Sequence, residues 1–241
     1  MNIEQFEKFT DTLPPYPGIQ GREKYFNSAV LVPFVFLNDE FHLLFQKRAS
    51  SISQGSEICF PGGKHEPAID HDFKCTAVRE TAEELGIDKN DVKVVGQLDT
   101  IVAPMGAIVE TYIGVLDKKI LDKIELDRRE VDAVFTIPLS YFNTIELQNY
   151  YVRVEIHPSV TDETGNETVL LPSKELGLPD KYQKPWGGKK HRVLIYKTEH
   201  GVIWGITAEI IFEMLQKVVM CGQASSVDDS WCTSSLYRDG G

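Results

Sequence analysis

The chain has 241 residues, enough for one large domain or for a core domain with an elaboration. Hydrophobic residues make up 42% and aromatic residues 10%, which excludes general disorder because a sizeable core can be buried. The net charge of −11 and the pI near 5.0 exclude a nonspecific nucleic-acid binder, which carries a basic face. Phosphate ligands stay open, because a bound cation can invert the field of an acidic pocket.

The cysteines and the N-terminus indicate a reducing compartment. No CxxC pair and no Cys/His cluster with zinc-ligand spacing occurs. Cys59 and Cys75 lie in apolar patterns, and we expect both in the core. The first residues lack the basic and then apolar run of a signal peptide, and no apolar stretch approaches the roughly 20 residues of a membrane span. The sequence therefore predicts a cytoplasmic protein with no membrane and no nucleic-acid partner.

The first quarter of the chain predicts an extension followed by a hairpin. Residues 1–27 hold a short polar helix and a Pro/Gly-rich linker, and form the N-terminal extension. Ser28–Leu37 is apolar and β-branched, which is typical of a buried strand, and Phe41–Arg48 follows a polar turn as its hairpin partner. A further short strand ends in Gly62-Gly63, and residues 64–71 form a loop.

A helix is predicted over Phe73–Leu85. Asp70 or Asp72 can cap its first turn, and Gly86 can end it in a left-handed conformation. Its inward stripe is predicted to be Cys75, Val78, Ala82 and Leu85.

The second half predicts more strands and a closing helix. Strands are expected at Val92–Pro104, Ile108–Leu116 and Ala133–Ile137, and then at residues 148–160 and 191–198, with residues 184–190 as a loop. Residues 204–219 form an amphipathic helix, and the tail, 221–241, has no period and is expected to be flexible. The fold class is therefore α+β, a mixed β-sheet flanked by helices. The helix's inward residues are predicted to be Ile206, Ile210, Ile211, Met214, Leu215 and Val218.

Three glutamates share one face of the helix at 73–85. Glu80, Glu83 and Glu84 stand at helical spacing near the C-terminal end, where negative charge is unfavourable. Arg79 and Lys74 are placed too poorly to neutralise all three. A solvated acidic face explains the pattern, and so does a site for a cation such as Mg²⁺, which takes carboxylate oxygens.

The double glycine before this helix has two explanations of equal weight. Gly62-Gly63 lets the backbone approach a ligand or a metal closely, or else marks a β-bulge. It is no P-loop, because no Gly-Lys-Ser/Thr ends it.

Gly63 followed by the stretch RETAEELGI (Arg79–Ile87) resembles the signature of the Nudix hydrolase family. Thr81 stands where the signature has an apolar residue. Gly63 lies two residues further from Arg79 than in the signature, and His71 stands where a Glu is usual. Glu66, Asp70 or Asp72 can take that acidic role.

Upstream, LLFQKR and GSEICFPGG resemble the coenzyme A pyrophosphatase subgroup, which accepts a longer loop. An Arg usual in that subgroup is replaced by the stretch Ser51-Ile52-Ser53. The resemblance spans about Ser28 to Met214, without the region near 145–195.

The resemblance implies an α/β/α sandwich and a metal-dependent pyrophosphohydrolase. The implied domain covers 28–220, with a hairpin insertion near 145–195. Arg79 is expected to orient a box glutamate by a bidentate pair, and Glu130, before Glu110, is the candidate for the catalytic base. The implied ligands of Mg²⁺ or Mn²⁺ are the carbonyl of Gly63 and the side chains of Glu80, Glu83 and Glu84.

The implied substrate is coenzyme A or a CoA derivative, cleaved to 4′-phosphopantetheine and adenosine 3′,5′-bisphosphate. Lys47 and Arg48, with Gly62 nearby, are candidates for binding its phosphates. Two alternatives stay open: another substrate such as ADP-ribose, NADH or a diadenosine polyphosphate, and a noncatalytic nucleotide-binding module. The number of metals and a homodimer also stay open. Further candidates for phosphate or adenine contacts are Lys189, Lys190, Arg192, Trp186, Tyr150 and Tyr151.

Overall fold

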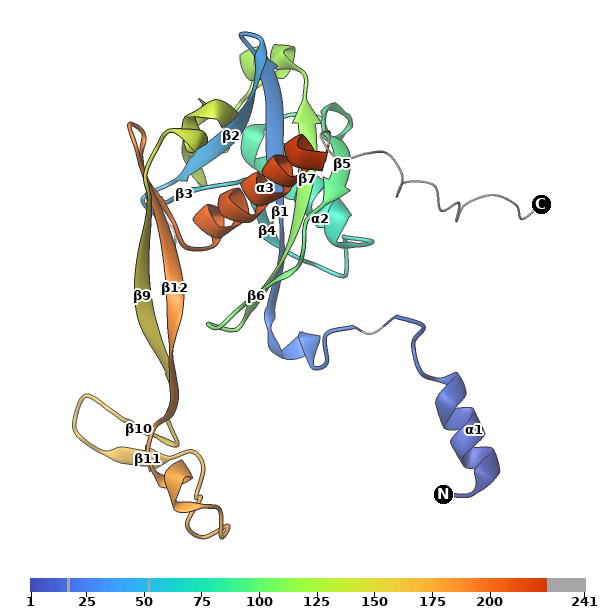
Figure 1. Ribbon diagram of the computed structural model, residues 1–241, viewed down its shortest axis with the longest axis vertical. Helices are drawn as coiled ribbons and strands as arrows, with labels where there is room; N and C mark the ends of the chain where they lie inside the picture. The colour runs from blue at the N-terminus through green and yellow to red at the C-terminus, as the bar shows by residue number, and fades with distance from the viewer. Residues whose placement is uncertain (17, 52, 225–241) are drawn as a thin grey trace.

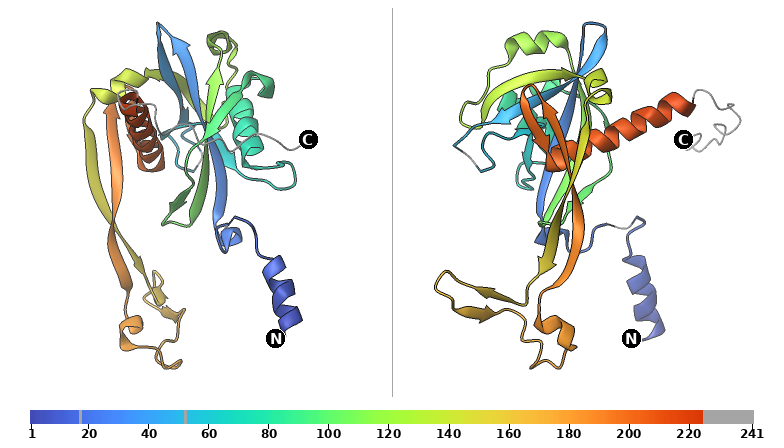
Figure 2. Two further views of the ribbon diagram at one scale, coloured as in Figure 1. Left: turned by 45° about the vertical axis from the view of Figure 1, so that its right-hand side comes forward. Right: turned by 60° about the vertical axis from the view of Figure 1, so that its left-hand side comes forward.

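The body of the protein is a mixed β-sheet with a helix on each face (Figure 1, Figure 2). The computed structural model describes residues 1–16, 18–51 and 53–224, with only the helical backbone for 220–224. The eight-stranded sheet has the order β3-β2-β1-β7-β5, and β4 pairs with β1, β6 with β7 and β8 with β2. Its strands are β1 (Phe26–Leu37), β2 (Glu40–Arg48), β3 (Ile58–Cys59), β4 (Gly62–Lys64), β5 (Lys93–Gln97), β6 (Ile101–Ala103), β7 (Ala107–Leu116) and β8 (Val131–Pro138).

Strand β1 organises the sheet. It pairs in parallel with β7 along ten residues, and antiparallel with β2 at one end and with β4 at the other. The turn to β2 places Asn38 and Asp39 at positive φ, which suits the twist of a tight hairpin. Because β2 and β4 share one side of β1, the sheet is split there, and the split brings Gln46 of β2 near Gly62 of β4.

The helices α2 (Phe73–Leu85) and α3 (Gly205–Ala224) cover opposite faces of the sheet. Leu31 and Leu44 pack with Ala77 and Leu85 of α2 in one core. Val32 and Phe45 point to the other side, where Ile211 and Met214 of α3 complete a second core. The period-two alternation of β1 and β2 thus feeds both cores, and the predicted α/β/α sandwich is confirmed. The remaining helical segments are α1 (Ile3–Asp11), η1 (Arg22–Lys24), η2 (Lys89–Asp91), η3 (Lys118–Lys123), η4 (Leu139–Asn143) and η5 (Asp180–Gln183).

A long hairpin extends away from the sheet, and we call residues 147–198 the arm (Figure 1). Its strands β9 (Leu147–Ile156) and β12 (Trp186–Thr198) pair antiparallel, and β13 (Gly201–Trp204) joins β12 at the base. A small sheet of β10 (Ser159–Thr161) and β11 (Glu167–Val169) lies at the tip. No helix in the described ranges is long and apolar enough to cross a bilayer.

Several details of the predicted elements are wrong. The single strand expected at Val92–Pro104 is divided into β5 and β6, and the loop expected at 184–190 belongs to β12 from Trp186 onward. Cys75 is exposed, since Thr76 and Ala77 take the buried positions of α2. Val218 is 47% exposed because α3 continues past the edge of its core. The tail predicted to be flexible lies outside the described residues from 225 onward.

Candidate active site

Helix α2 begins and ends through the predicted signals. The Asp72 carboxylate accepts a hydrogen bond from the Cys75 amide at 2.8 Å, which caps the first turn. Gly86 ends the helix at φ 63°, and a Cβ there would lie 2.0 Å from the carbonyl oxygen of Glu125. The absence of a side chain at Gly86 lets the following loop pass close to the helix end. A hydrogen bond from the Asp127 amide to the carbonyl of Glu84 holds the loop there. The helix end thereby positions Asp127 and, three residues on, Glu130.

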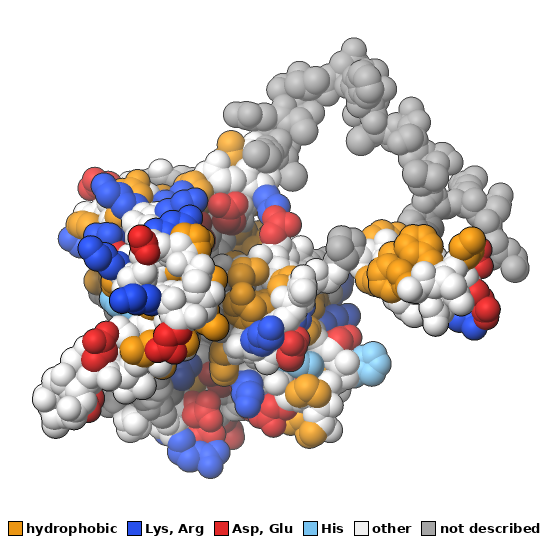
Figure 3. All heavy atoms as spheres, turned by 90° about the horizontal axis from the view of Figure 1, so that it is seen from below, with side chains coloured by type: hydrophobic (Ala, Val, Ile, Leu, Met, Phe, Trp, Pro, Cys, Tyr) orange, Lys and Arg blue, Asp and Glu red, His pale blue; other side chains and the backbone are white. Residues whose placement is uncertain are grey.

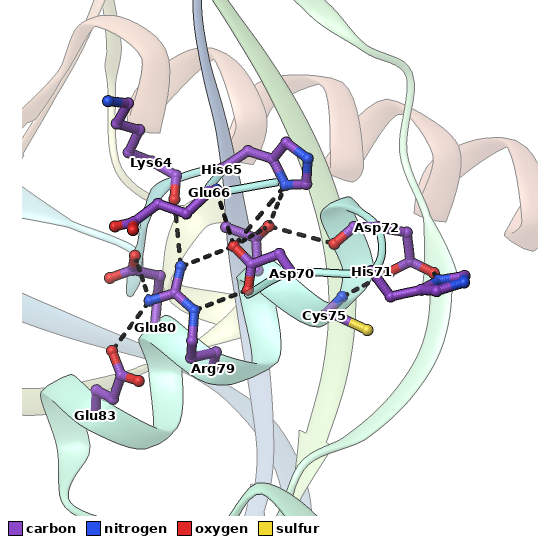
Figure 4. A network of polar contacts seen from close by, with 11 residues as sticks. Lys64, His65, Glu66, Asp70, His71, Asp72, Cys75, Arg79, Glu80 and Glu83 are labelled. Atoms are coloured by element: carbon purple, nitrogen blue, oxygen red, sulfur yellow. Dashed lines mark hydrogen bonds and ion pairs between the residues drawn. The ribbon is translucent and has the colours of Figure 1, made fainter. Parts of the chain in front are cut away.

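Arg79 makes its bidentate pair with Asp70 of the preceding loop (Figure 4). Nε donates to Oδ1 at 2.8 Å and a terminal nitrogen donates to Oδ2 at 2.9 Å. The predicted bidentate pair with a box glutamate is therefore wrong. The other terminal nitrogen lies 2.9 Å from Glu80 and 3.0 Å from Glu83, so Arg79 neutralises two of the three glutamates more directly than the sequence predicts.

The loop before α2 places Asp70, not His71, at the arginine. The Asp70 side chain is 1% exposed, and its Oδ2 accepts further hydrogen bonds from the Glu66 amide and the Thr76 hydroxyl. His71 points outward with a side chain that is 91% exposed. Of the three acidic residues considered for the signature's acidic role, Asp70 is the one that contacts Arg79. The hydrogen bond to Arg79 holds the pKa of the Asp70 carboxyl well below its usual range.

Glu84 is buried and, among the residues that the structure describes, has no cation within ion-pair distance. Its carboxylate accepts hydrogen bonds from the Gln46 amide at 2.8 Å and from the backbone amide of Gly62 at 2.9 Å. These contacts join α2 to both strands beside the split in the sheet. Desolvation exceeds their effect and raises the pKa of Glu84 to about 7. The site therefore holds a carboxyl group that a cation would help to ionise.

Glu80 lies directly against Gly63. A Cβ on Gly63 would be 2.4 Å from the carboxyl carbon of Glu80, so only glycine leaves room for this carboxylate beside β4. Burial raises the pKa of Glu80, and Arg79 opposes that rise. The double glycine thus lets the backbone of β4 lie close to the Glu80 side chain. It does not mark a bulge, since β4 pairs with β1 in regular register.

One acidic pocket of about 340 Å³ contains the box glutamates and the predicted base. Its oxygen donors are of the hard type that Mg²⁺ and Mn²⁺ prefer, so the donor set fits such an ion. As the side chains lie, no three His, Cys, Asp or Glu residues of the described chain converge on a common point. Binding an ion would need rotation of the glutamates that Arg79 contacts. The lining residues are Glu80, Glu83, Glu84, Asp127, Arg129 and Glu130.

The sequence did not single out Gln46, Asp127 or Arg129. Gln46 lies in an ordinary strand pattern, and only its burial beside Glu84 gives it a role. Asp127 and Arg129 form an ion pair at 2.5 Å on the loop behind α2. Their closeness in the sequence to Glu130 is the one signal that points to them.

Glu110, the second candidate for the base, lies outside the acidic pocket. It is 5% exposed, and its carboxylate accepts hydrogen bonds from Gln97 and Thr100 at 2.8 Å. Its other oxygen pairs with Arg22 of the N-terminal extension, whose guanidinium also lies 4.3 Å from the ring centre of Phe73. Through these contacts, Glu110 holds the N-terminal extension against the sheet and α2.

The candidate phosphate-binding residues lie in two places. Lys47 and Arg48 end β2, outside the lining of the acidic pocket, and Arg48 donates to the Ser53 carbonyl at 3.4 Å. The others lie on the arm, and none of them lines the acidic pocket. Lys190 lies over the Tyr151 ring, Trp186 packs on Tyr182, and Arg192 pairs with Glu209, while Tyr150 is half-exposed and Lys189 pairs in register with Val154.

Comparison with known proteins gives one family. A NUDIX domain model matches residues 26–149, which is half of the chain. Mouse peroxisomal coenzyme A diphosphatase NUDT7 is 37% identical over 124 residues, covering 51% of this chain and 50% of that protein. The uncharacterized Nudix hydrolase NudL of Photorhabdus laumondii is 28% identical over 211 residues, covering 88% of this chain and 94% of that protein. A MutT/nudix family protein from Enterococcus faecalis has a TM-score of 0.45 at 14% identity, covering 91% of this chain and 70% of that one.

Proposed function

The chain belongs to the Nudix family, and on that premise we propose that it hydrolyses the diphosphate bond of coenzyme A or a CoA derivative with Mg²⁺ or Mn²⁺. The observation that carries the proposal is the acidic pocket, in which Glu80, Glu83, Glu84 and Glu130 lie together. A diphosphate is an anion, and it would be repelled from four carboxylates without a cation between them. The pocket is therefore suited to a metal–diphosphate complex.

We assign the metal ligands to Glu80, Glu83 and Glu84, with the carbonyl of Gly63 beside them. When bound, the metal supplies neutralisation of the diphosphate charge and a lower pKa for a coordinated water. Arg79 stays bound to Asp70 and limits the positions that Glu80 and Glu83 can adopt. Glu84 is fixed by Gln46 and Gly62, so it presents its oxygens with little loss of side-chain entropy.

Glu130 is proposed as the base that takes a proton from the attacking water. It shares the acidic pocket with the glutamates of α2, and its charge is close enough to contribute to the raised pKa of Glu80. Its backbone carbonyl accepts a hydrogen bond from the Ala49 amide at 2.8 Å, which fixes the loop against the end of β2. The side chain can thus approach a water without movement of the backbone.

The choice of CoA rests on two supports. The relative named as a coenzyme A diphosphatase shares 37% identity across the matched half of the chain. Lys47 and Arg48 end β2 directly after Gln46, the partner of Glu84, and are the candidates for contacts with substrate phosphates. Release of 4′-phosphopantetheine and adenosine 3′,5′-bisphosphate is the expected outcome.

A substrate panel tests the proposal. Coenzyme A, ADP-ribose, NADH and diadenosine tetraphosphate are incubated with the protein and Mg²⁺ or Mn²⁺, and products are identified by mass. Glu83→Gln is the inactive comparison, and Glu163→Gln, on the exposed tip of the arm, is the matched control. Hydrolysis of ADP-ribose without hydrolysis of CoA would overturn CoA as the proposed substrate. Binding of a diphosphate without turnover of any of them would overturn the proposal that the protein is an enzyme.

A further inference from the structure

The loop before α2 is held at two points. Among residues 64–72, only His65 and Asp70 are not exposed, and their side chains are 14% and 1% exposed. Asp70 binds Arg79 and through it reaches two glutamates of the acidic pocket (Figure 4). Ordering a loop costs about 1 to 2 kcal/mol per residue, so a loop with two points of attachment depends on both. The contacts of His65 therefore bear on the glutamates.

His65 contacts α2 through both its polar atoms and its ring. Its Nδ1 lies 2.7 Å from the hydroxyl oxygen of Thr76, and that hydroxyl donates to Asp70 at 3.0 Å. The imidazole stacks on the ring of Phe73, the first residue of α2, with the ring centres 4.1 Å apart and the planes at 29°. A shift of the Phe73 ring would thus displace His65 and, through Thr76, disturb the surroundings of Asp70.

Arg22 of the N-terminal extension covers the ring of Phe73. Its guanidinium carbon lies 4.3 Å from the ring centre, its Nε donates to the side-chain oxygen of Asn27 at 2.9 Å, and a terminal nitrogen pairs with Glu110. The backbone carbonyl of Asn27 accepts a hydrogen bond from the His65 amide at 2.9 Å. Arg22 is therefore connected to His65 by two routes, through the Phe73 ring and through Asn27.

These contacts lie where the extension meets the body of the protein. The preceding helix, α1, stands apart from the body with none of its residues buried, and Figure 3 shows its hydrophobic side chains on the surface. Arg22, His65 and Phe73 border a hollow of about 500 Å³. Since one side of this group faces a hollow and not a packed core, the three side chains depend on one another for their orientation.

Two separate properties of Arg22 serve its two sets of partners. Glu110 needs only a positive charge nearby, which a lysine also supplies. Phe73 and Asn27 need the flat guanidinium and its Nε, because a planar cation stacks on an aromatic ring and presents its donors in a fixed geometry. Substitutions can therefore separate the ion pair from the contacts that reach His65.

We propose that Arg22 is a positioning residue of the acidic pocket. Its guanidinium plane holds Phe73 and His65 in place, and the loop then presents Asp70 to Arg79 in the orientation that leaves the glutamates ready for a divalent metal. The inference rests on the proposed function for the role of the glutamates, and it makes the N-terminal extension a part of the site. Without the plane, the loop opens more often and the metal binds more weakly.

Hydrogen–deuterium exchange of residues 64–72 in EDTA tests the loop without metal or turnover. Arg22→Lys keeps a charge beside Glu110 and loses the plane. Glu110→Gln is the matched control, because it removes the charge of the pair and leaves the guanidinium over Phe73. The amides of Glu66 and Asp70 are hydrogen-bonded within the loop and report its opening. Their exchange should be about tenfold faster in Arg22→Lys and as in the wild type in Glu110→Gln.

Calorimetry with Mn²⁺ alone measures the effect on the glutamates. Arg22→Lys should bind Mn²⁺ about three- to tenfold more weakly than the wild type, and Glu110→Gln as tightly. Phe73→Leu removes the flat ring but keeps an apolar side chain, and should behave as Arg22→Lys does. The kcat/KM of both weakened variants should fall at limiting Mn²⁺ and recover in excess Mn²⁺, which a general loss of stability would not produce in them alone.

Wild-type exchange and Mn²⁺ affinity in Arg22→Lys, or equal changes in Arg22→Lys and Glu110→Gln, would overturn the inference. The expected changes without hydrolysis of any diphosphate would overturn only the proposed function. Faster exchange in Arg22→Lys, with no Mn²⁺ bound even by the wild type, would overturn the metal-binding role of the glutamates and the inference with it.

Discussion

Arg79 of helix α2 binds Asp70 of the loop before it through two parallel hydrogen bonds of 2.8 and 2.9 Å. The arginine meanwhile contacts Glu80 and Glu83, so one guanidinium connects the loop to two carboxylates of the acidic pocket. Asp70 is thus a positioning residue for the glutamates, although it lies outside the pocket lining.

Replacing Asp70 should therefore affect both stability and activity. Asp70→Ala leaves the Arg79 guanidinium without its main partner in a buried setting, and should lower the free energy of unfolding by about 3 kcal/mol or more. In protein that stays folded, kcat/KM should fall about ten- to a hundredfold, because Glu80 and Glu83 lose their orientation. Urea unfolding and steady-state kinetics measure the two effects. His71→Ala is the neighbouring control, and an effect as large as that of Asp70→Ala would contradict the assignment.

The adjacent glycines should respond differently to alanine. Gly62 has φ 152°, and a Cβ there would lie 2.4 Å from the backbone carbonyl oxygen of Ala29. Gly62→Ala should thus cost about 2 kcal/mol or more in stability, since neither backbone can move freely. A Cβ on Gly63 meets only the flexible end of Glu80, so Gly63→Ala should fold well and lose activity. Thermal melts beside kinetics test the contrast, and equal melting temperatures of the two variants would refute it.

The raised pKa of Glu84 predicts a pH-dependent stability of the metal-free protein. The carboxyl has a pKa of about 7 in the folded state and near 4.5 when unfolded. At pH values between these two pKa values, the folded protein binds more protons than the unfolded chain. The free energy of unfolding therefore falls by roughly 3 kcal/mol as pH rises from 5 to 8.

The comparison variant is Glu84→Gln, which stays neutral and should lack this fall. The Oε1 atom of Gln46 has no hydrogen-bond partner in the described part of the chain, so the Gln46 amide can turn to accept a hydrogen bond from the new side chain. Urea unfolding of the wild type and of Glu84→Gln in EDTA, each at pH 5 and at pH 8, gives the free energies of unfolding to be compared. Parallel changes in the two proteins would show that Glu84 is not the group responsible.

Substitutions of Glu130 and Glu110 should distinguish a catalytic role from a packing role. Glu130→Gln should lower kcat by about a hundredfold or more with no change in melting temperature, because it removes a proton acceptor at the edge of an open pocket. Glu110→Gln leaves Arg22 without a charged partner, and should lower the melting temperature while kcat of the folded protein changes little. Circular dichroism melts and kcat measurements distinguish the two. The reverse pattern would transfer the role of base to Glu110.

Local sequence signals predicted most of the fold. The hairpin of β1 and β2, the Asp72 cap and the Gly86 end are encoded within a few residues, and each is confirmed. The loop from Lys64 to Asp72 could not be predicted, because its conformation depends on hydrogen bonds between Asp70 and residues of α2. The exposure of Cys75 likewise depends on which face of α2 packs against the sheet. A short apolar stripe in the sequence does not determine that face.

The glutamates of the acidic pocket were predicted from spacing and resemblance, but their environment was not. Gln46 reaches Glu84 only because β2 and β4 separate beside β1. No periodic pattern reports that split. The roles of these residues in metal binding and catalysis stay predictions that the variants above test.

The parallel pairing of β1 with β7 also sets an order of assembly. The loop, α2 and β4 all lie between these two strands in the chain, so the three glutamates of α2 belong to a segment enclosed by a long-range contact, whereas Glu130 of the acidic pocket follows β7. Such contacts form late, since the intervening chain must first lose its freedom. A nascent chain that ends before Ala107 has no β7 to pair with β1. The acidic pocket should therefore mature only after synthesis has passed Glu130, which is the last residue of its lining.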